Sequence, residues 1–194
     1  MQYAFIHIPK CAGMSMTKSI QQTCPDKIAI FGHGCLLERV NKYKQIIILR
    51  EPVDRFSSSF FYLRSYKINK DSKFTTPDQL IDGLLCFDPL AFKFLKVQPH
   101  SHHVNGKEIN TDWVFHPQSA WVHNPHIVIL YEKLQEGIDE LNRLLNIDLK
   151  LDRINSRKRT KFSYLQRHLD FINIYYRTDF ELYDKYKHYS NILP

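Results

Sequence analysis

Short apolar runs alternate with segments of helical periodicity along most of this chain, and this alternation is the feature that most restricts its fold. The run at 46–49 is the most apolar of all, which is typical of a parallel strand buried on both faces. Strands that alternate with helices indicate an α/β fold, because a helix is the usual connection between parallel strands. We therefore expect a mostly parallel central sheet flanked by helices. The strands are predicted at 3–8, 27–31, 46–49 and 126–131, and the helices that follow them at 14–23, 35–43, 52–66 and 132–146.

The segments outside this pattern are less regular. Prolines mark the starts of two further predicted helices, at 77–86 and 89–96. A His-rich, polar region at 97–126 is expected to be irregular, and the aromatic-rich stretch 162–189 is predicted to be helical and to pack across the sheet. With 194 residues, no internal repeat and no convincing linker, the sequence predicts a single domain over 1–194.

The net charge of +7 is concentrated in one stretch of the chain. Seven basic residues and one acidic residue between 150 and 167 give +6, so the rest of the chain is nearly balanced. We expect a basic loop at 150–161 that closes over a small anionic cofactor or guides an acidic acceptor, and we do not expect nucleic acid as a partner. The alternative is an ordinary solvated run of charges.

Composition and cysteine spacing limit the class of protein. The 43% of hydrophobic residues excludes a disordered chain, and no apolar run approaches the roughly 18 residues that cross a bilayer. The first ten residues lack the basic region of a signal peptide, so we expect a cytoplasmic or otherwise soluble protein without a membrane anchor. The four cysteines form no C-x-x-C pair, which predicts reduced thiols. The histidines of the 97–126 region lack the partners that would complete a metal site.

The first predicted strand leads into the loop Pro9-Lys10-Cys11-Ala12-Gly13-Met14-Ser15, which precedes a helix. A strand, a tight loop of small residues and a helix start offer backbone N–H groups and a positive dipole end to an anion. Lys10 lies at the mouth of this loop, and Ser15 and Thr17 add hydroxyl donors. The pattern is not a Walker A motif, because the lysine precedes the glycine. An ordinary turn with a surface lysine remains the alternative.

A second strand–helix junction carries the sequence Leu49-Arg50-Glu51-Pro52-Val53-Asp54-Arg55-Phe56-Ser57-Ser58-Ser59-Phe60. Arg50 follows the buried strand, and Ser58 lies eight residues later in the predicted helix. An arginine fork and a nearby hydroxyl can together hold a phosphate. Because ligands of open α/β sheets lie beyond the carboxyl ends of the strands, both loops are expected to face one ligand. Pairing of Arg50 with Glu51 and of Arg55 with Asp54 is the alternative, which we prefer for Arg55 only.

Together, the two loops resemble the sulfotransferases that use 3′-phosphoadenosine 5′-phosphosulfate (PAPS), in particular the Golgi-type carbohydrate branch that includes the 2-O-sulfotransferase-like enzymes. Residues 7–15 are similar to that family's 5′-phosphosulfate loop, H-I-P-K-[TC]-[AG]-G-T-S, and residues 50–60 to its 3′-phosphate motif, R-[DE]-P-x-x-R-x-x-S-x-[YF]. The similarity extends over 3–66 and is weaker over 113–187, where Gln118, Asp179 and Tyr183 are among the similar positions. The resemblance implies a P-loop-NTPase-like sulfotransferase fold and transfer of a sulfuryl group from PAPS to an acceptor hydroxyl.

The resemblance also implies roles for individual residues. Lys10 would contact the oxygen that bridges phosphate and sulfate, and Arg50 with Ser58 would hold the 3′-phosphate. Met14 stands where the family has threonine, so one hydroxyl is missing while the backbone N–H is kept. No metal is required if Lys10 and backbone donors balance the charge. The residues assigned to PAPS are Lys10, Cys11, Ala12, Gly13, Met14, Ser15, Thr17, Arg50, Ser58 and Arg157.

An acceptor hydroxyl needs a general base, and histidine is the side chain that titrates near neutrality. His33, in Gly32-His33-Gly34 after the second predicted strand, is the candidate, with a turn histidine of no chemical role as the alternative. His7 lies in the first predicted strand and is expected to be a core or edge residue. The acceptor is expected to be a carbohydrate or another hydroxyl compound. The candidates for contact with it are Lys158, Arg159, Trp113 and His102.

Two other functions compete with this prediction. A nucleotide-dependent kinase could share the fold, although the position of Lys10 and the lack of a Mg²⁺-holding motif argue against it. A non-enzymatic binder of acidic polymer or nucleic acid could use the 150–167 stretch, with an affinity that falls steeply with salt and is unaffected by Lys10→Ala. That alternative leaves both strand-end motifs unexplained.

Overall fold

The computed structural model describes residues 2–32, 37–65, 72–96, 102–104, 107–109, 114–122, 124–152 and 162–188. Its contacts divide the chain into two compact units. Unit 1 comprises Met1–Glu51, Gln118–Arg159 and Thr178–Pro194, and unit 2 comprises Pro52–Pro117 and Thr160–Arg177. The single domain over 1–194 stays a prediction.

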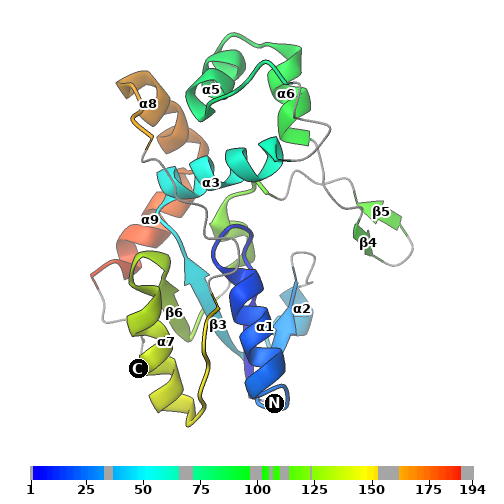
Figure 1. Ribbon diagram of the computed structural model, residues 1–194, viewed down its shortest axis with the longest axis vertical. Helices are drawn as coiled ribbons and strands as arrows, with labels where there is room; N and C mark the ends of the chain where they lie inside the picture. Colours follow the sequence, from blue (N-terminus) through cyan, green and yellow to red (C-terminus); the bar gives the residue numbers. More distant parts are fainter. Residues whose placement is uncertain are drawn as a thin grey trace. The chain divides into compact units, whose positions relative to one another are not determined.

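Unit 1 is built on a four-stranded, all-parallel sheet (Figure 1). Its strands are β1 (Tyr3–Ile6), β2 (Ile28–Phe31), β3 (Lys44–Leu49) and β6 (Ile127–Leu130), in the order β2-β1-β3-β6. Isoleucine dominates these runs because a β-branched side chain packs well on a pleated surface. The predicted α/β fold with a mostly parallel sheet flanked by helices is thereby confirmed. β1, β2 and β6 lie within the predicted ranges, whereas β3 begins two residues before the predicted 46–49, at Lys44.

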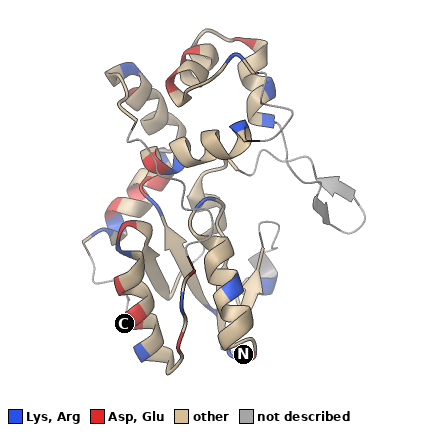
Figure 2. Cartoon of the chain, in the orientation of Figure 1, with Lys and Arg blue, Asp and Glu red and all other residues tan. Residues whose placement is uncertain are grey.

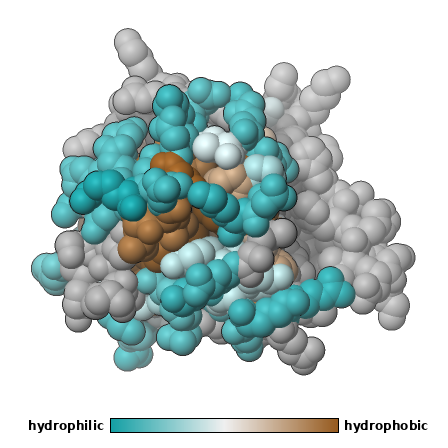
Figure 3. All heavy atoms as spheres, turned by 90° about the horizontal axis from the view of Figure 1, so that it is seen from below, coloured by the Kyte–Doolittle hydropathy of each residue, from teal (hydrophilic) through white to brown (hydrophobic). Residues whose placement is uncertain are grey.

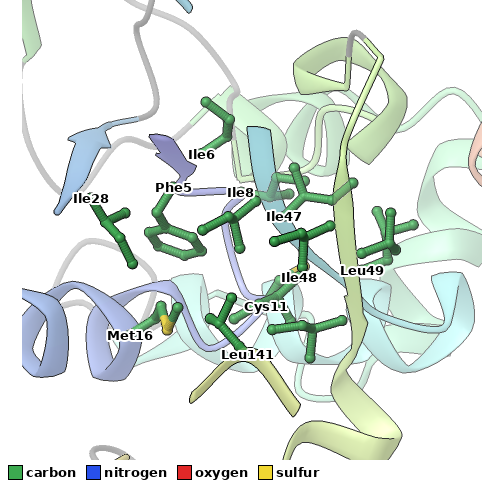
Figure 4. Packing of buried hydrophobic residues seen from close by; sticks show 14 of the residues in the cluster. Phe5, Ile6, Ile8, Cys11, Met16, Ile28, Ile47, Ile48, Leu49 and Leu141 are labelled. Carbon is green, nitrogen blue, oxygen red and sulfur yellow. The ribbon is translucent and has the colours of Figure 1, made fainter. Parts of the chain in front are cut away.

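The helices of unit 1 pack onto this sheet through a continuous apolar core. They are α1 (Gly13–Thr23), α2 (Leu37–Val40), α7 (Leu134–Leu145) and, from Thr178 onward, α9 (Arg177–Tyr186). Figure 4 shows Met16 of α1 and Leu141 of α7 on the same side of the sheet as Phe5 and Ile48, whereas Ile6 and Ile47 point to the other side. Each of these buried side chains contributes about 1.5–3 kcal/mol relative to exposure.

The C-terminal stretch 162–189, predicted to be helical and to pack across the sheet, is helical over most of its described residues. It forms two helices, α8 (Gln166–Tyr175) and α9, which are separated at Tyr176. Only α9 contributes to the core of unit 1, through Tyr186, and α8 belongs to unit 2. The helix expected at 132–146 begins at Leu134, because a 3₁₀ turn over Tyr131–Lys133 separates it from β6.

Unit 2 is mainly helical. It contains α3 (Pro52–Arg64), α5 (Pro77–Leu85), α6 (Pro89–Lys96) and α8, so three of its helices start at a proline. The side chains of Phe56, Phe60, Phe74, Phe94 and Phe115 are buried in it. An antiparallel hairpin of β4 (His102–Val104) and β5 (Lys107–Ile109) lies in the region that the sequence predicts to be irregular.

Arg55 and Ser59 are buried in α3, and both donate a hydrogen bond to the carbonyl oxygen of Val114, at 3.3 and 2.9 Å. The guanidinium of Arg55 also lies over the ring of Tyr176. These contacts give Arg55 a structural role within unit 2.

The surface carries charges of both signs. Figure 2 shows basic and acidic residues interspersed along α7 and α9.

Partly buried side chains such as Tyr3, Leu145 and Ile147 pack around the core of unit 1. Seen from below (Figure 3), apolar residues gather in one region that hydrophilic residues border. Among the residues that the structure describes, no helix is both long enough and apolar enough to span a bilayer.

Candidate functional site

The loop between β1 and α1 is held in an unusual backbone conformation. Lys10 and Ala12 both have positive φ angles, 65° and 58°, which non-glycine residues adopt rarely. α1 begins directly after Ala12, at Gly13. The ring of His7 lies so close to Gly13 that a Cβ at this position would be 1.7 Å from its Cδ2 atom. Position 13 therefore requires glycine, because Gly13 packs directly against the ring of His7 just beyond the end of the first strand.

The start of α1 can receive an anion. No side chain within the described ranges caps its first turn, so its leading N–H groups are not used by a capping residue. The hydroxyl of Thr17 is buried and has no hydrogen-bond partner in the part of the chain that the structure describes. Ser15 is half-buried, whereas the Met14 side chain is 60% exposed. Backbone donors at a helix start, together with a buried hydroxyl, form a donor set that fits a phosphate or sulfate group.

Arg50 brings the second loop to the first. It follows β3, which pairs with β1 in parallel, so both loops leave the same edge of the sheet. Its side chain is 2% exposed, and the guanidinium donates a hydrogen bond of 2.9 Å to the carbonyl oxygen of Lys10. The carbon of the guanidinium also lies 4.2 Å from the centroid of the Tyr131 ring. The structure therefore brings together Arg50 and Lys10, which the sequence places 40 residues apart.

A buried glutamine from a third segment joins both loops. Gln118 is 1% exposed, and its side-chain oxygen accepts hydrogen bonds from the Arg50 amide (2.9 Å) and the Cys11 thiol (3.1 Å). Its side-chain nitrogen donates to the Arg50 carbonyl at 2.7 Å. The carboxylate of Asp179, on α9, accepts from the backbone amides of Gln118 and Ser119 at 2.7 and 2.8 Å. The sequence assigns no role to Gln118 or Asp179. They are only positions that are similar to the sulfotransferase family within 113–187, where the resemblance is weaker.

The charge state of His7 follows from its position beside the loop. Burial and, to a smaller degree, the positive charge of Lys10 lower the pKa of His7 from 6.5 to about 4. Both causes disfavour the protonated ring. His7 is therefore neutral at neutral pH and acts as a packing residue beneath Gly13.

The other predicted site residues are distributed as follows. Ser58 is buried on α3 and belongs to unit 2, so its predicted partnership with Arg50 stays a prediction. His102 lies in strand β4. Outside the described residues lie His33, Trp113, Arg157, Lys158 and Arg159.

The basic stretch is described only at its ends. Lys150 pairs with Asp148 and Arg167 pairs with Asp82 in unit 2. Within the described ranges, no group of three or more His, Cys, Asp or Glu side chains could hold a metal ion.

No protein-family model, no curated protein and no solved structure matches this chain.

Proposed function

We propose that this chain is a PAPS-dependent sulfotransferase, with the P-loop-NTPase-like fold of that family, and that its acceptor is a hydroxyl group, most naturally of a carbohydrate. The observation that carries the proposal is the hydrogen bond from Arg50 to the carbonyl oxygen of Lys10, at 2.9 Å. Arg50, the first residue of the motif that resembles the 3′ half of a PAPS site, thereby contacts the loop that resembles the 5′ half, as their strand-end positions predict. A polymer binder does not explain this convergence of both motifs, and the position of Lys10 before Gly13 argues against a kinase that shares the fold.

The residues of the first loop would hold the 5′ side of the nucleotide. The N–H groups at the start of α1 and the hydroxyl of Thr17 supply donors, and the Lys10 side chain supplies a positive charge. When bound, PAPS supplies the sulfuryl group that is transferred. The contribution of Lys10 is to stabilise the negative charge that develops on the phosphate side as that group departs.

The 3′-phosphate would be bound by Arg50, whose side chain is held in place by the Lys10 carbonyl and the Tyr131 ring. A fixed guanidinium suits this task because its planar fork matches the oxygens of a phosphate. Ser58, Arg157 and the acceptor contacts remain predictions from the sequence alone.

Calorimetric titration with 3′-phosphoadenosine 5′-phosphate (PAP), in parallel with ATP, tests the proposal. PAP is expected to bind more tightly than ATP, and Arg50→Ala is expected to weaken PAP binding by about 10- to 100-fold, since a charge-assisted hydrogen bond is lost. Arg143→Ala, at an exposed position in the last turn of α7, is the matched control and should leave PAP affinity unchanged.

Three results of this titration would refute the proposal. They are the absence of PAP binding, an equal or higher affinity for ATP, and an Arg50→Ala affinity equal to that of the wild type. Affinity for an acidic polymer or nucleic acid that falls steeply with salt and is unaffected by Lys10→Ala would favour the polymer binder. Lys18→Ala removes the same charge from an exposed position on α1 and serves as the control for Lys10→Ala.

His33 has a separate test. As the general base it should contribute to transfer and not to nucleotide binding. His33→Ala is therefore expected to keep PAP affinity within about twofold while transfer of labelled sulfate from PAPS to a panel of carbohydrate hydroxyls falls about 100-fold or more. A variant that transfers sulfate at the wild-type rate would show that the base is another group, and loss of PAP binding would indicate a structural role.

A further inference from the structure

The Gln118 side chain continues the hydrogen-bond ladder of the sheet at the point where the strands stop. The pairing of β3 with β6 ends at Leu49 and Leu130, so Arg50 is the first residue beyond the ladder. Gln118 accepts from the Arg50 amide and donates to the Arg50 carbonyl, at 2.9 and 2.7 Å, and so replaces a neighbouring strand for this one residue. Because both backbone groups of Arg50 are engaged, the direction in which its side chain leaves the strand is fixed.

The same side chain also reaches the first loop. The oxygen that accepts from Arg50 accepts from the thiol of Cys11, the residue between the two left-handed positions Lys10 and Ala12. Gln118 thus contacts both anion loops with one carboxamide, and it does so from a position that is 1% exposed. A buried polar group that makes hydrogen bonds through both its oxygen and its nitrogen favours one arrangement of its neighbours.

Helix α9 supports this arrangement by two routes. Asp179, itself 1% exposed, accepts the amides of Gln118 and Ser119 and so holds the short 3₁₀ helix Gln118–Trp121 in place. Separately, the Tyr183 hydroxyl donates to Glu132 at 3.0 Å, and the other oxygen of Glu132 accepts from the Glu51 amide at 2.9 Å. The second loop is therefore tied to α9 through both Arg50 and Glu51.

We infer that Gln118 is a positioning residue that holds the Lys10 loop and Arg50 at the spacing needed by one nucleotide with anionic groups at its 5′ and 3′ positions. Asp179 in turn holds Gln118 in place. This inference rests on the proposed function for the identity of the ligand. The carboxamide oxygen and nitrogen of Gln118 contact the two loops themselves, at Arg50 and Cys11, so the role inferred for Gln118 is positioning and not ligand contact. It acts through the two loops.

The test compares Gln118→Ala with Gln45→Ala. Gln45 is a second glutamine buried in the same unit, at the opposite end of β3, and its side-chain oxygen has no partner within the described residues. Both variants remove the carboxamide of a buried glutamine, but only Gln118→Ala removes the hydrogen bonds to Arg50 and Cys11 in the two loops. PAP affinity, measured by calorimetry, is expected to fall about tenfold or more in Gln118→Ala and less than about twofold in Gln45→Ala.

Hydrogen exchange without any nucleotide supplies an independent readout. The amides of Arg50 and Met16 report on the second and first loops, because they donate to Gln118 and to the Ala12 carbonyl. Both are expected to exchange faster in Gln118→Ala and at the wild-type rate in Gln45→Ala.

The outcomes separate the two proposals. If the wild type does not bind PAP, the proposed function fails, and the exchange rates alone decide whether Gln118 holds the loops. If the wild type binds PAP, a Gln118→Ala variant with unchanged affinity, or one no weaker than Gln45→Ala, overturns the positioning role. Unchanged exchange at both amides overturns it in either case.

Two substitutions of Asp179 keep the inference testable if Gln118→Ala does not fold. Asp179→Asn retains one acceptor for the two amides, whereas Asp179→Ala retains none. PAP affinity is expected to decrease in the order wild type, Asp179→Asn, Asp179→Ala. Equal affinities in all three proteins would refute the role of Asp179.

Discussion

Replacing Gly13 by alanine is expected to lower the free energy of unfolding by about 3 kcal/mol, at the upper end of the cost of overpacking a core. The added Cβ would be 1.7 Å from Cδ2 and 2.1 Å from Nε2 of His7, distances that no relaxation of the methyl group itself can relieve. The His7 ring would have to move, and this partly buried ring stacks beside Phe5, a core residue of unit 1. Denaturation with urea, followed by circular dichroism, measures the loss.

Gly32→Ala is the matched control. A Cβ at Gly32 meets no atom within 4 Å. The free energy of unfolding of this variant is therefore expected to lie within about 0.5 kcal/mol of the wild-type value. The double variant His7→Ala/Gly13→Ala should lose less stability than the sum of the two single variants, because the clash needs both side chains. Strict additivity, or equal losses in Gly13→Ala and Gly32→Ala, would show that the contact with His7 is not the cause.

The fold of unit 1 is predictable from sequence because its strands are short, apolar and separated by helical patterns. Ile46–Leu49 reads as a buried strand and lies near the centre of the sheet, and the prolines at 77 and 89 mark two helix starts correctly. The interruption at Tyr176 is less visible, because apolar residues continue on both sides of it. At the interruption the buried Tyr176 donates a hydrogen bond from its hydroxyl to the carbonyl oxygen of Phe115, a contact between segments 61 residues apart that the local sequence does not indicate.

The candidate site is predictable only in part, for a similar reason. The strand-end positions of Lys10 and Arg50 follow from local sequence, since each comes directly after an apolar run. The contact between Gly13 and His7 depends on the left-handed turn at Ala12, which its residue type does not indicate. Gln118 and Asp179 are isolated polar residues, 61 positions apart, and no periodicity distinguishes them from surface residues. Only the three-dimensional arrangement shows that both are buried beneath the loops.

The second large effect concerns pH. Stability is expected to fall as the pH is lowered from about 6.5 to about 4, and His7 should contribute up to about 3 kcal/mol of that loss. Its pKa is lowered to about 4 in the folded protein, first by burial and then by the charge of Lys10. Above pH 6.5 the ring is neutral in both the folded and unfolded states, so it contributes no pH dependence. Between these two values the unfolded chain binds a proton that the folded protein does not, and unfolding becomes more favourable.

Comparison of His7→Gln with the wild type isolates this contribution from that of the carboxylates. The variant should show a shallower dependence of unfolding free energy on pH between about 6.5 and 4, whatever its absolute stability. Lys10→Ala should reduce the slope only slightly, because burial is the larger cause and is still present in that variant. A His7→Gln slope equal to that of the wild type would mean that the ring is hydrated, and the close packing against Gly13 would then be wrong as well.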